Sequence, residues 1–207
     1  MIAFLHTSPI HIEKFEKIVR KNNTNIEIKH FVNESLLDNA IKTGNVNSQA
    51  FQEEIEAIHK ENPTLFICTC STLGNECDKY NFINRIDEPI AKYLAENYKN
   101  IGLAFTANST ENSSSELLNK AASIVNKTIH ITPINCSEHW QHYETKNFNL
   151  YERGIANTIE SIADTVDVIF LAQASMEGAL KHLNHLKEKI KTSPEFGVSY
   201  LLTKNDD

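Results

Sequence analysis

Short apolar runs alternate with amphipathic segments along this chain, and this alternation constrains the fold more than any other feature of the sequence. Residues 2–6, 65–69, 101–105 and 168–172 are the most apolar runs, and each is too short for a buried helix. Segments with apolar residues at helical spacing separate them. Strands that alternate with helices form a parallel sheet with right-handed crossovers, so the sequence predicts an α/β fold.

The other elements follow from the same spacing rules. Further strands are expected over residues 26–31, 82–86, 128–131 and 198–202. Helices are expected over residues 11–21, 36–42, 47–62, 151–163 and 175–191, with two more beginning near Glu88 and Ser113. Ser113 as the N-cap is expected to form a capping box with Glu116, and Pro89 fits a first helical turn, where a missing N–H costs little. The polar, irregular stretch 135–148 is expected to be a loop.

The pattern of strands and helices begins again near residue 100. IAFLHTS at 2–8 resembles IGLAFTA at 101–107, and LFICTCSTLG at 65–74 resembles VIFLAQASME at 168–177. The two offsets are nearly equal, as an internal repeat would require. We therefore expect two similar lobes, the first over residues 1–98 with 192–207 packing back on it, and the second over 99–191.

Charge and hydropathy exclude several classes of protein. The 207 residues carry a net charge of −7 and a pI of about 5.7, which argues against a basic face for nucleic acid. No apolar run approaches the roughly 20 residues of a membrane helix, and MIAFLHTSPI lacks the basic leader of a signal peptide. We expect a cytoplasmic protein whose partner is a small molecule, not a nucleic acid or a membrane.

Small polar residues follow four of the predicted strands. Ligands of parallel α/β sheets gather at the carboxyl ends of strands, so these residues are candidates for a binding site. No GxGxxG or GxxxxGK[ST] motif is present to hold a nucleotide, and short hydroxyls and amides suit a small carboxylate. The alternative is that they only cap helices. The candidates are Thr7, Ser8, Ser71, Thr72, Thr106, Asn108, Thr110, Gln173 and Ser175.

Cys70 carries the sharpest chemical implication. A thiol at a strand exit, followed at once by hydroxyls, is expected to have a pKa below the free value of about 8.5 and to act as a base or nucleophile. The alternative is a small core hydrophobe, which fits Cys68 better. A metal site of Cys68, Cys70 and Cys77 with His6 or His11 is a third interpretation, but the spacing CxCx6C is not a standard zinc pattern.

Two other residues have both a functional and a structural interpretation. Arg85 is expected to pair either with a substrate carboxylate or with a nearby acid such as Asp87. His6 ends the first strand and is the histidine best placed by topology.

Four segments together resemble the aspartate/glutamate/hydantoin racemase superfamily. ICTCSTLG is similar to the first cysteine motif of that family, C-N-T, with Cys70-Ser71-Thr72 in its place. IGLAFTANST is similar to the IGxxATxGT segment that opens the second half, and FINRIDEPI to the segment that closes the first half. VIFLAQASMEGAL is similar to the second cysteine motif, LGCAGM. The resemblance covers nearly the whole chain.

The resemblance implies two pseudo-symmetric lobes with an active site between them. It implies two cysteines on either side of the substrate α-carbon, a small carboxylate or amide substrate, and no metal, pyridoxal phosphate or other cofactor. A homodimer is compatible with it. Cys70 matches the first cysteine, whereas Gln173 stands at the second and can donate a hydrogen bond but cannot shuttle a proton at neutral pH.

The expected function is therefore a racemase or isomerase that uses Cys70 as base, acid or nucleophile. The alternatives are a single-cysteine decarboxylase, a reaction with His6 as the second acid, and a binding or sensing protein of the same fold.

Overall fold

The computed structural model describes residues 1–22 and 25–206, and the chain divides into two compact units. Unit 1 contains residues 1–89 and 194–207, and unit 2 contains residues 90–193. The expected boundary at 98/99 placed the helix after Glu88 in the first lobe. In the structure this helix, α5 (Glu88–Asn97), packs its buried residues Ile90 and Leu94 on the core of unit 2.

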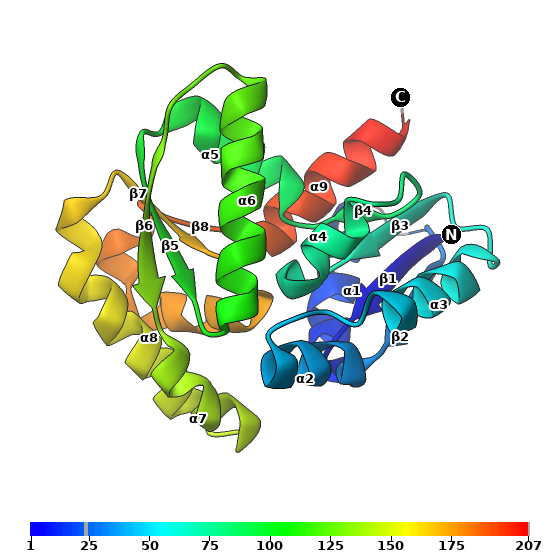
Figure 1. Ribbon diagram of the computed structural model, residues 1–207, viewed down its shortest axis with the longest axis horizontal. Helices are drawn as coiled ribbons and strands as arrows, with labels where there is room; N and C mark the ends of the chain where they lie inside the picture. Colours follow the sequence, from blue (N-terminus) through cyan, green and yellow to red (C-terminus); the bar gives the residue numbers. More distant parts are fainter. Residues whose placement is uncertain (23–24, 207) are drawn as a thin grey trace. The chain divides into compact units, whose positions relative to one another are not determined.

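The sheet of unit 1 has four parallel strands in the order β2-β1-β3-β4 (Figure 1). The strands are β1 (Ile2–His6), β2 (Ile28–Val32), β3 (Leu65–Cys68) and β4 (Asn84–Arg85). β1 and β3 are buried along their whole length, as expected for strands covered on both faces. Their register pairs Leu5 with Cys68, so β1 ends one residue beyond β3 at the same edge of the sheet.

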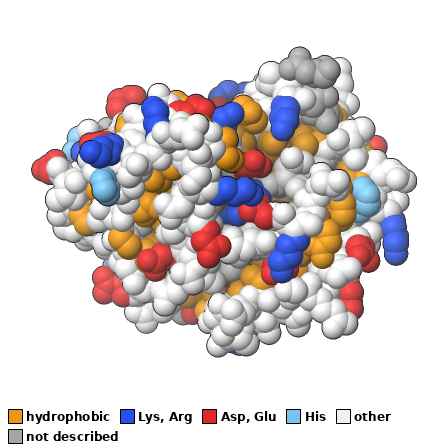
Figure 2. Space-filling view, turned by 45° about the horizontal axis from the view of Figure 1, so that its top comes forward, with side chains coloured by type: hydrophobic (Ala, Val, Ile, Leu, Met, Phe, Trp, Pro, Cys, Tyr) orange, Lys and Arg blue, Asp and Glu red, His pale blue; other side chains and the backbone are white. Residues whose placement is uncertain are grey.

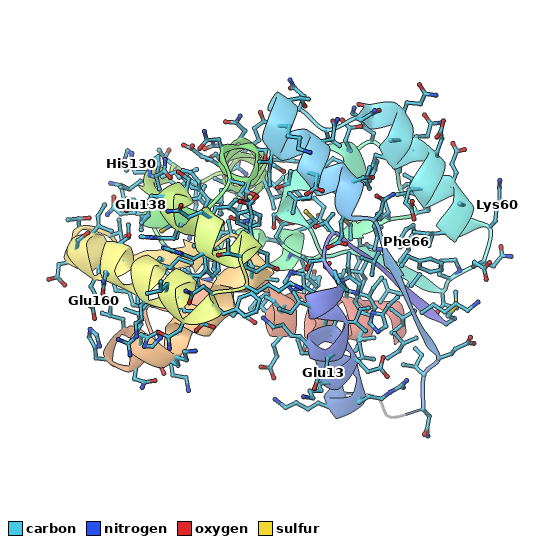
Figure 3. All side chains as sticks on the ribbon, turned by 90° about the horizontal axis from the view of Figure 1, so that it is seen from below. Glu13, Lys60, Phe66, His130, Glu138 and Glu160 are labelled. Atoms are coloured by element: carbon cyan, nitrogen blue, oxygen red, sulfur yellow. The ribbon has the colours of Figure 1, made fainter. Side chains whose placement is uncertain are left out.

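Helices cover both faces of this sheet. They are α1 (Ile12–Asn22), α2 (Glu34–Thr43), α3 (Ser48–His59), the single turn α4 (Gly74–Cys77) and α9 (Ser193–Asp206). Phe66 and Cys68 face α2 and α3 and share a core cluster with Phe51 and Ile55 of α3. Figure 3 labels Phe66 within unit 1. On the opposite face, Phe4 contacts Phe15 of α1, with ring centroids 5.5 Å apart.

Unit 2 repeats the arrangement of unit 1. Its four parallel strands have the order β6-β5-β7-β8, which is the order of unit 1 with each strand replaced by its counterpart. The strands are β5 (Asn100–Phe105), β6 (His130–Asn135), β7 (Val168–Leu171) and β8 (Ile190–Thr192). α5 and α6 (Asn108–Ile124) pack on one face, and α8 (Phe148–Ile162) packs on the other (Figure 1). The internal repeat expected from the sequence is therefore present in the fold.

The last expected strand is wrong. Residues 198–202 belong to helix α9, because Val198, Leu201 and Leu202 are buried at helical spacing and Pro194 fits the first turn. The fourth strand of unit 2 is β8, which lies in the segment expected to be one long helix. That segment begins instead as a 3₁₀ helix over Ala174–His182.

Three further expectations differ from the structure. The expected loop 135–148 contains the short helix α7 (Trp140–Glu144), because Trp140 and Tyr143 pack against the core of unit 2. Helix α6 begins at Asn108, upstream of the expected cap at Ser113. The expected strand 82–86 is reduced to the two residues of β4.

The surface carries charges of both signs. Figure 2 shows lysine and arginine side chains interspersed with aspartate and glutamate on the face in view, on a chain with a net charge of −7. Among the helices of the described residues, none has both the length and the apolar character that crossing a lipid bilayer demands.

Candidate functional site

Cys70 and Gln173 occupy equivalent positions in the two units. Each lies two residues beyond the end of the second central strand, Cys70 after β3 and Gln173 after β7, and each precedes a 3₁₀ helix. The registers are also equivalent, because Leu5 pairs with Cys68 in unit 1 and Ala104 pairs with Leu171 in unit 2. Thr7 and Thr106 then face Cys70 and Gln173 respectively.

Three donors lie within hydrogen-bonding reach of the Cys70 sulfur. They are the hydroxyl of Thr7 and the backbone N–H groups of Thr72 and Leu73. The N–H of Leu73 also donates to the backbone oxygen of Cys70 at 3.0 Å. Burial and the nearby Cys68 raise the pKa of Cys70 to about 11, although these three donors lower it. The expectation of a pKa below the free-cysteine value is therefore wrong. At neutral pH the group is therefore a thiol, and its three donors offset only part of the cost of forming the anion in this buried setting.

The other cysteines near Cys70 are more buried than it is. Cys68, the last residue of β3, belongs to the same core cluster as Cys70. Its thiol donates a weak hydrogen bond to the backbone oxygen of Cys70, with an S···O distance of 3.8 Å. Cys68 and Cys77 are each 1% exposed, whereas Cys70 is partly exposed. In the part of the chain that the structure describes, no three histidine, cysteine or acidic side chains form a group that could hold a metal ion.

Arg85 belongs to a buried ion pair. Its Nε and one terminal nitrogen donate to the two carboxylate oxygens of Asp87 at 3.0 and 3.1 Å, and both side chains are almost fully buried. The guanidinium packs on Gly74, where an added Cβ would lie 2.1 Å from Cζ of Arg85. Of the two interpretations of Arg85, the structure thus has the pair with an acid. Gly74 is required because only glycine leaves room for this pair.

His6 lies at the centre of a buried hydrogen-bond network. Its Nδ1 is 2.8 Å from Oγ1 of Thr69 and its Nε2 is 2.8 Å from Nδ1 of His30, while Nε2 of His30 is 3.0 Å from a carboxylate oxygen of Glu16. Thr69 donates its own hydrogen to the backbone oxygen of Leu5. Because the Thr69 hydroxyl donates elsewhere, Nδ1 of His6 must donate to Thr69, so a neutral His6 accepts at Nε2 from His30.

His6 is therefore unsuited to the role of a second acid. Burial, followed by the charge of His30 and then that of His11, lowers the pKa of His6 to about 3. Both of its ring nitrogens are occupied by Thr69 and His30. Its side chain stacks on Phe4, on the face of the sheet opposite to Cys68 and Cys70.

The depressed pKa of His6 predicts loss of stability in acid. The folded pKa of about 3 lies below the unfolded value of about 6.5, so the stabilisation is complete above pH 6.5 and is lost as pH falls toward 3. His6 should contribute a slope of about 1.4 kcal/mol per pH unit in this window. We expect the urea unfolding free energy of His6→Gln to fall less steeply from pH 6.5 to 4. The exposed His185→Gln should keep the wild-type slope, and an unchanged slope in His6→Gln would contradict the assignment.

In unit 2, Thr106 fixes the side-chain amide of Gln173. The backbone N–H of Thr106 donates to Oε1 of Gln173 at 2.6 Å, and its hydroxyl donates to the same oxygen at 2.9 Å. A backbone N–H is only a donor, so the atom of Gln173 that faces it is the oxygen. Gln173 and Ser175 are partly exposed. The two nitrogen-bound hydrogens of Gln173 therefore remain as the donors that this position offers.

The remaining candidates differ in burial. Ser71, Thr72 and Thr110 are buried, Ser8 is partly exposed, and Asn108 is exposed at the first turn of α6. The sequence analysis missed Tyr151, whose hydroxyl is 3.3 Å from Oγ1 of Thr106 and 3.1 Å from Oγ of Ser175. The available signal was a tyrosine on the apolar face of the helix expected at 151–163, since a buried tyrosine hydroxyl requires a partner.

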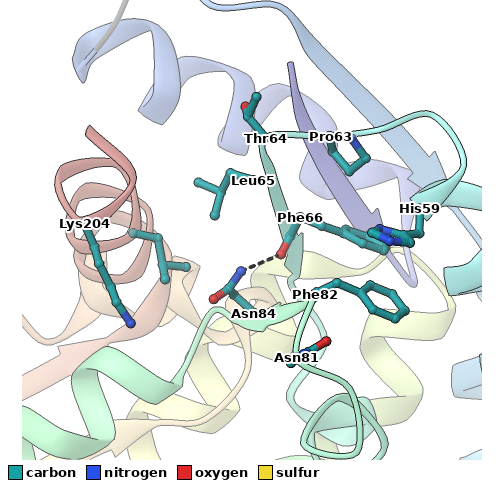
Figure 4. A pocket seen from close by; sticks show the side chains of 10 residues that line it. His59, Pro63, Thr64, Leu65, Phe66, Asn81, Phe82, Asn84 and Lys204 are labelled. Carbon is teal, nitrogen blue, oxygen red and sulfur yellow. Dashed lines mark hydrogen bonds between the residues drawn. The ribbon is translucent and has the colours of Figure 1, made fainter. Parts of the chain in front are cut away.

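A pocket of about 330 Å³ lies in unit 1, at the end of its sheet opposite to Cys70 (Figure 4). Its lining includes His59, Phe66, Asn84 and Lys204, and Nδ2 of Asn84 donates to the backbone oxygen of Phe66 at 3.1 Å. The amino end of β3 forms part of its wall, whereas Cys70 follows the carboxyl end. This pocket is therefore separate from the candidate residues of unit 1.

No protein-family model matches this sequence, and no curated protein matches it significantly. Solved structures match almost all of it. Aspartate racemase of Picrophilus torridus has a TM-score of 0.74 at 14% identity, covering 99% of this chain and 94% of its own. Glutamate racemase of Francisella tularensis, solved with D-glutamate, has a TM-score of 0.74 at 13% identity, covering 99% and 81%. Allantoin racemase of Klebsiella pneumoniae has a TM-score of 0.60 at 12% identity, covering 98% and 86%.

Proposed function

We propose that this chain, which has the fold of the aspartate/glutamate/hydantoin racemase superfamily, is an enzyme that moves a proton at the α-carbon of a small carboxylate or amide. Cys70 is the proposed acid and base. The observation that carries the proposal is the environment of its sulfur, which the Thr7 hydroxyl and the N–H groups of Thr72 and Leu73 surround at the end of β3. A cysteine with only a packing role gains nothing from three donors.

The proposed reaction begins with the Cys70 thiolate. The thiolate takes the α-proton, and the electrons of the C–H bond pass into the neighbouring carbonyl or carboxylate group to give an enediolate-type anion. The thiol then returns a proton to carbon. Because the pKa of Cys70 is raised to about 11, only about one molecule in ten thousand is a thiolate at pH 7. The rate of proton removal is therefore expected to rise with pH.

Gln173 stands where the resemblance has its second cysteine, so Cys70 is the one acid and base of the proposed reaction. The amide cannot take or give a proton at neutral pH, but its N–H group can donate a hydrogen bond to a developing oxyanion. Thr106 and Ser175 are its proposed partners in substrate binding, with Thr7, Ser8, Ser71, Thr72, Asn108 and Thr110. We therefore propose that Cys70 returns a proton to the face from which it removed one.

Proton exchange in D₂O tests the proposal directly. We expect one enantiomer of the substrate to replace its α-proton with deuterium faster than it inverts. The rate should rise about tenfold per pH unit between pH 7 and 10, below the raised pKa of Cys70. Proton NMR measures the exchange and chiral chromatography measures the inversion. The first compounds to test are both enantiomers of aspartate, glutamate and allantoin, after which the structural neighbours are named.

The same assay contains its own control. Cys136→Ala removes a buried thiol of unit 2 that has no proposed role, and it should retain the wild-type exchange rate. Absence of exchange with every compound tested across this pH range would contradict the proposed activity. Inversion as fast as exchange would contradict the one-sided role of Cys70.

A further inference from the structure

Four side chains of unit 2 form a continuous chain of hydrogen bonds. Ser175 Oγ is 3.1 Å from the Tyr151 hydroxyl, which is 3.3 Å from Oγ1 of Thr106, which is 2.9 Å from Oε1 of Gln173. Ser175 and Gln173 come from the segment after β7, Thr106 follows β5, and Tyr151 belongs to α8. The buried members Thr106 and Tyr151 thus connect two partly exposed residues of the candidate site.

The direction of every bond in this chain follows from one fixed donor. The backbone N–H of Thr106 requires an oxygen at Oε1 of Gln173, so the Thr106 hydroxyl must donate to that oxygen. Thr106 Oγ1 can then only accept from Tyr151, and Tyr151 in turn can only accept from Ser175. This is the one arrangement in which each contact carries a single hydrogen. Ser175 donates to Tyr151, Tyr151 donates to Thr106, and Thr106 donates to Gln173.

Tyr151 is held rigidly in the middle of the chain. Its side chain is completely buried. Its ring centroid lies 5.2 Å from that of Tyr143 and 6.5 Å from that of Trp140. Burial also raises the pKa of Tyr151 well above the usual tyrosine value, so the hydroxyl keeps its hydrogen throughout the pH range of an activity assay. Reversal of the chain would require a rotation or ionisation that this packing opposes.

We propose that Tyr151 is a positioning residue that sets the ligand specificity of Gln173 and Ser175 in unit 2. It holds Gln173 with its N–H hydrogens available and commits the Ser175 hydrogen to the protein, so Ser175 offers only lone pairs to a ligand. The complementary ligand has an acceptor oxygen for Gln173 and an N–H or O–H donor for Ser175. This inference deepens the proposed function and rests on it for the assignment of the residues to a substrate site.

Hydrogen exchange at one backbone amide tests the positioning role without any ligand. The Thr106 amide donates to Gln173, whereas the Ala172 amide donates to the backbone oxygen of Ala104 on the same strands at 2.9 Å. In Tyr151→Phe we expect exchange at Thr106 to accelerate about tenfold relative to exchange at Ala172, since a hydrogen bond worth about a factor of ten loses its support. Tyr143→Phe removes a hydroxyl from a neighbouring ring and should leave the ratio of the Thr106 and Ala172 exchange rates unchanged. Equal acceleration at both amides, or no acceleration at Thr106, would overturn the proposal.

Binding of two matched ligands tests the specificity. Aspartate and succinate share two carboxylates, but only aspartate has an N–H donor. Both proteins carry Cys70→Ala. The one that retains Tyr151 should bind aspartate more tightly than succinate. Tyr151→Phe should reduce the ratio of the two dissociation constants about tenfold, because Ser175 regains a hydrogen that it can donate to a carboxylate oxygen.

Isothermal titration calorimetry measures these dissociation constants without any catalytic step. The result therefore stands even if the proposed proton exchange is not observed. Three results would each overturn the specificity role. The ratio of the two dissociation constants could be unchanged in Tyr151→Phe, it could change equally in Tyr143→Phe, or the protein that retains Tyr151 could bind aspartate no better than succinate.

Discussion

Cys70→Ala is expected to lower the rate of α-deuterium exchange by about 10²–10⁴-fold, the usual contribution of a positioned acid or base. The substitution removes the only group at the end of β3 that is proposed to carry the proton. Thr7 and the N–H groups of Thr72 and Leu73 remain in place, because their positions depend on β1 and on the backbone after Cys70. The measurement is the initial exchange rate by proton NMR at pH 9.

Two comparisons separate chemistry from structure in this variant. Cys70→Ser keeps the size of the side chain, but its hydroxyl is a far weaker acid than a thiol, so the loss of rate should be as large as in Cys70→Ala. The urea midpoints of both variants should stay near that of the wild type, because Cys70 is partly exposed. Retention of the wild-type exchange rate in either variant would remove Cys70 as the acid and base.

Arg85→Met should destabilise unit 1 by about 3–5 kcal/mol, the largest effect on stability that the structure predicts. The variant leaves the carboxylate of Asp87 buried, with a relative exposure of 1%, and without the guanidinium that donates to both of its oxygens. An uncompensated buried charge is far more costly than the pair itself is stabilising. The measurement is the unfolding free energy from urea titration followed by circular dichroism.

The double variant Arg85→Met with Asp87→Asn is the matched control for this prediction. Removal of the second charge should recover part of the loss, since no carboxylate then lacks a partner. Lys17→Met breaks an exposed ion pair with Glu13 on α1 and should change stability little. A wild-type unfolding free energy in Arg85→Met would show that the ion pair is dispensable and would return Arg85 to consideration as a carboxylate ligand.

The architecture was predictable because it depends on patterns that local sequence contains. Apolar runs such as Ile2–His6 and Val168–Leu171 can only be buried strands, and their recurrence after about a hundred residues matches two sheets with the same strand order. The position of Cys70 beyond β3 followed from the same pattern.

Other features depend on contacts that no local pattern records. Residues 198–202 contain alternating and helical spacings at once, and only the packing of Val198 and Leu201 decides for a helix. The pKa of Cys70 is raised because burial outweighs its three donors, and burial is a property of the finished fold. Tyr151 joins Thr106 to Ser175 through distances between segments far apart in sequence.

The division of the chain also determines the order in which a ribosome can complete the two units. Residues 90–193 form unit 2 without interruption, whereas unit 1 needs α9, which is synthesised afterwards. α9 lies so close to the first segment that a Cβ on Gly197 would be 2.2 Å from the backbone oxygen of Ile86. Domains on nascent chains generally mature from the amino terminus onward. In this chain we expect the opposite order, with unit 1, which contains Cys70, completed after unit 2.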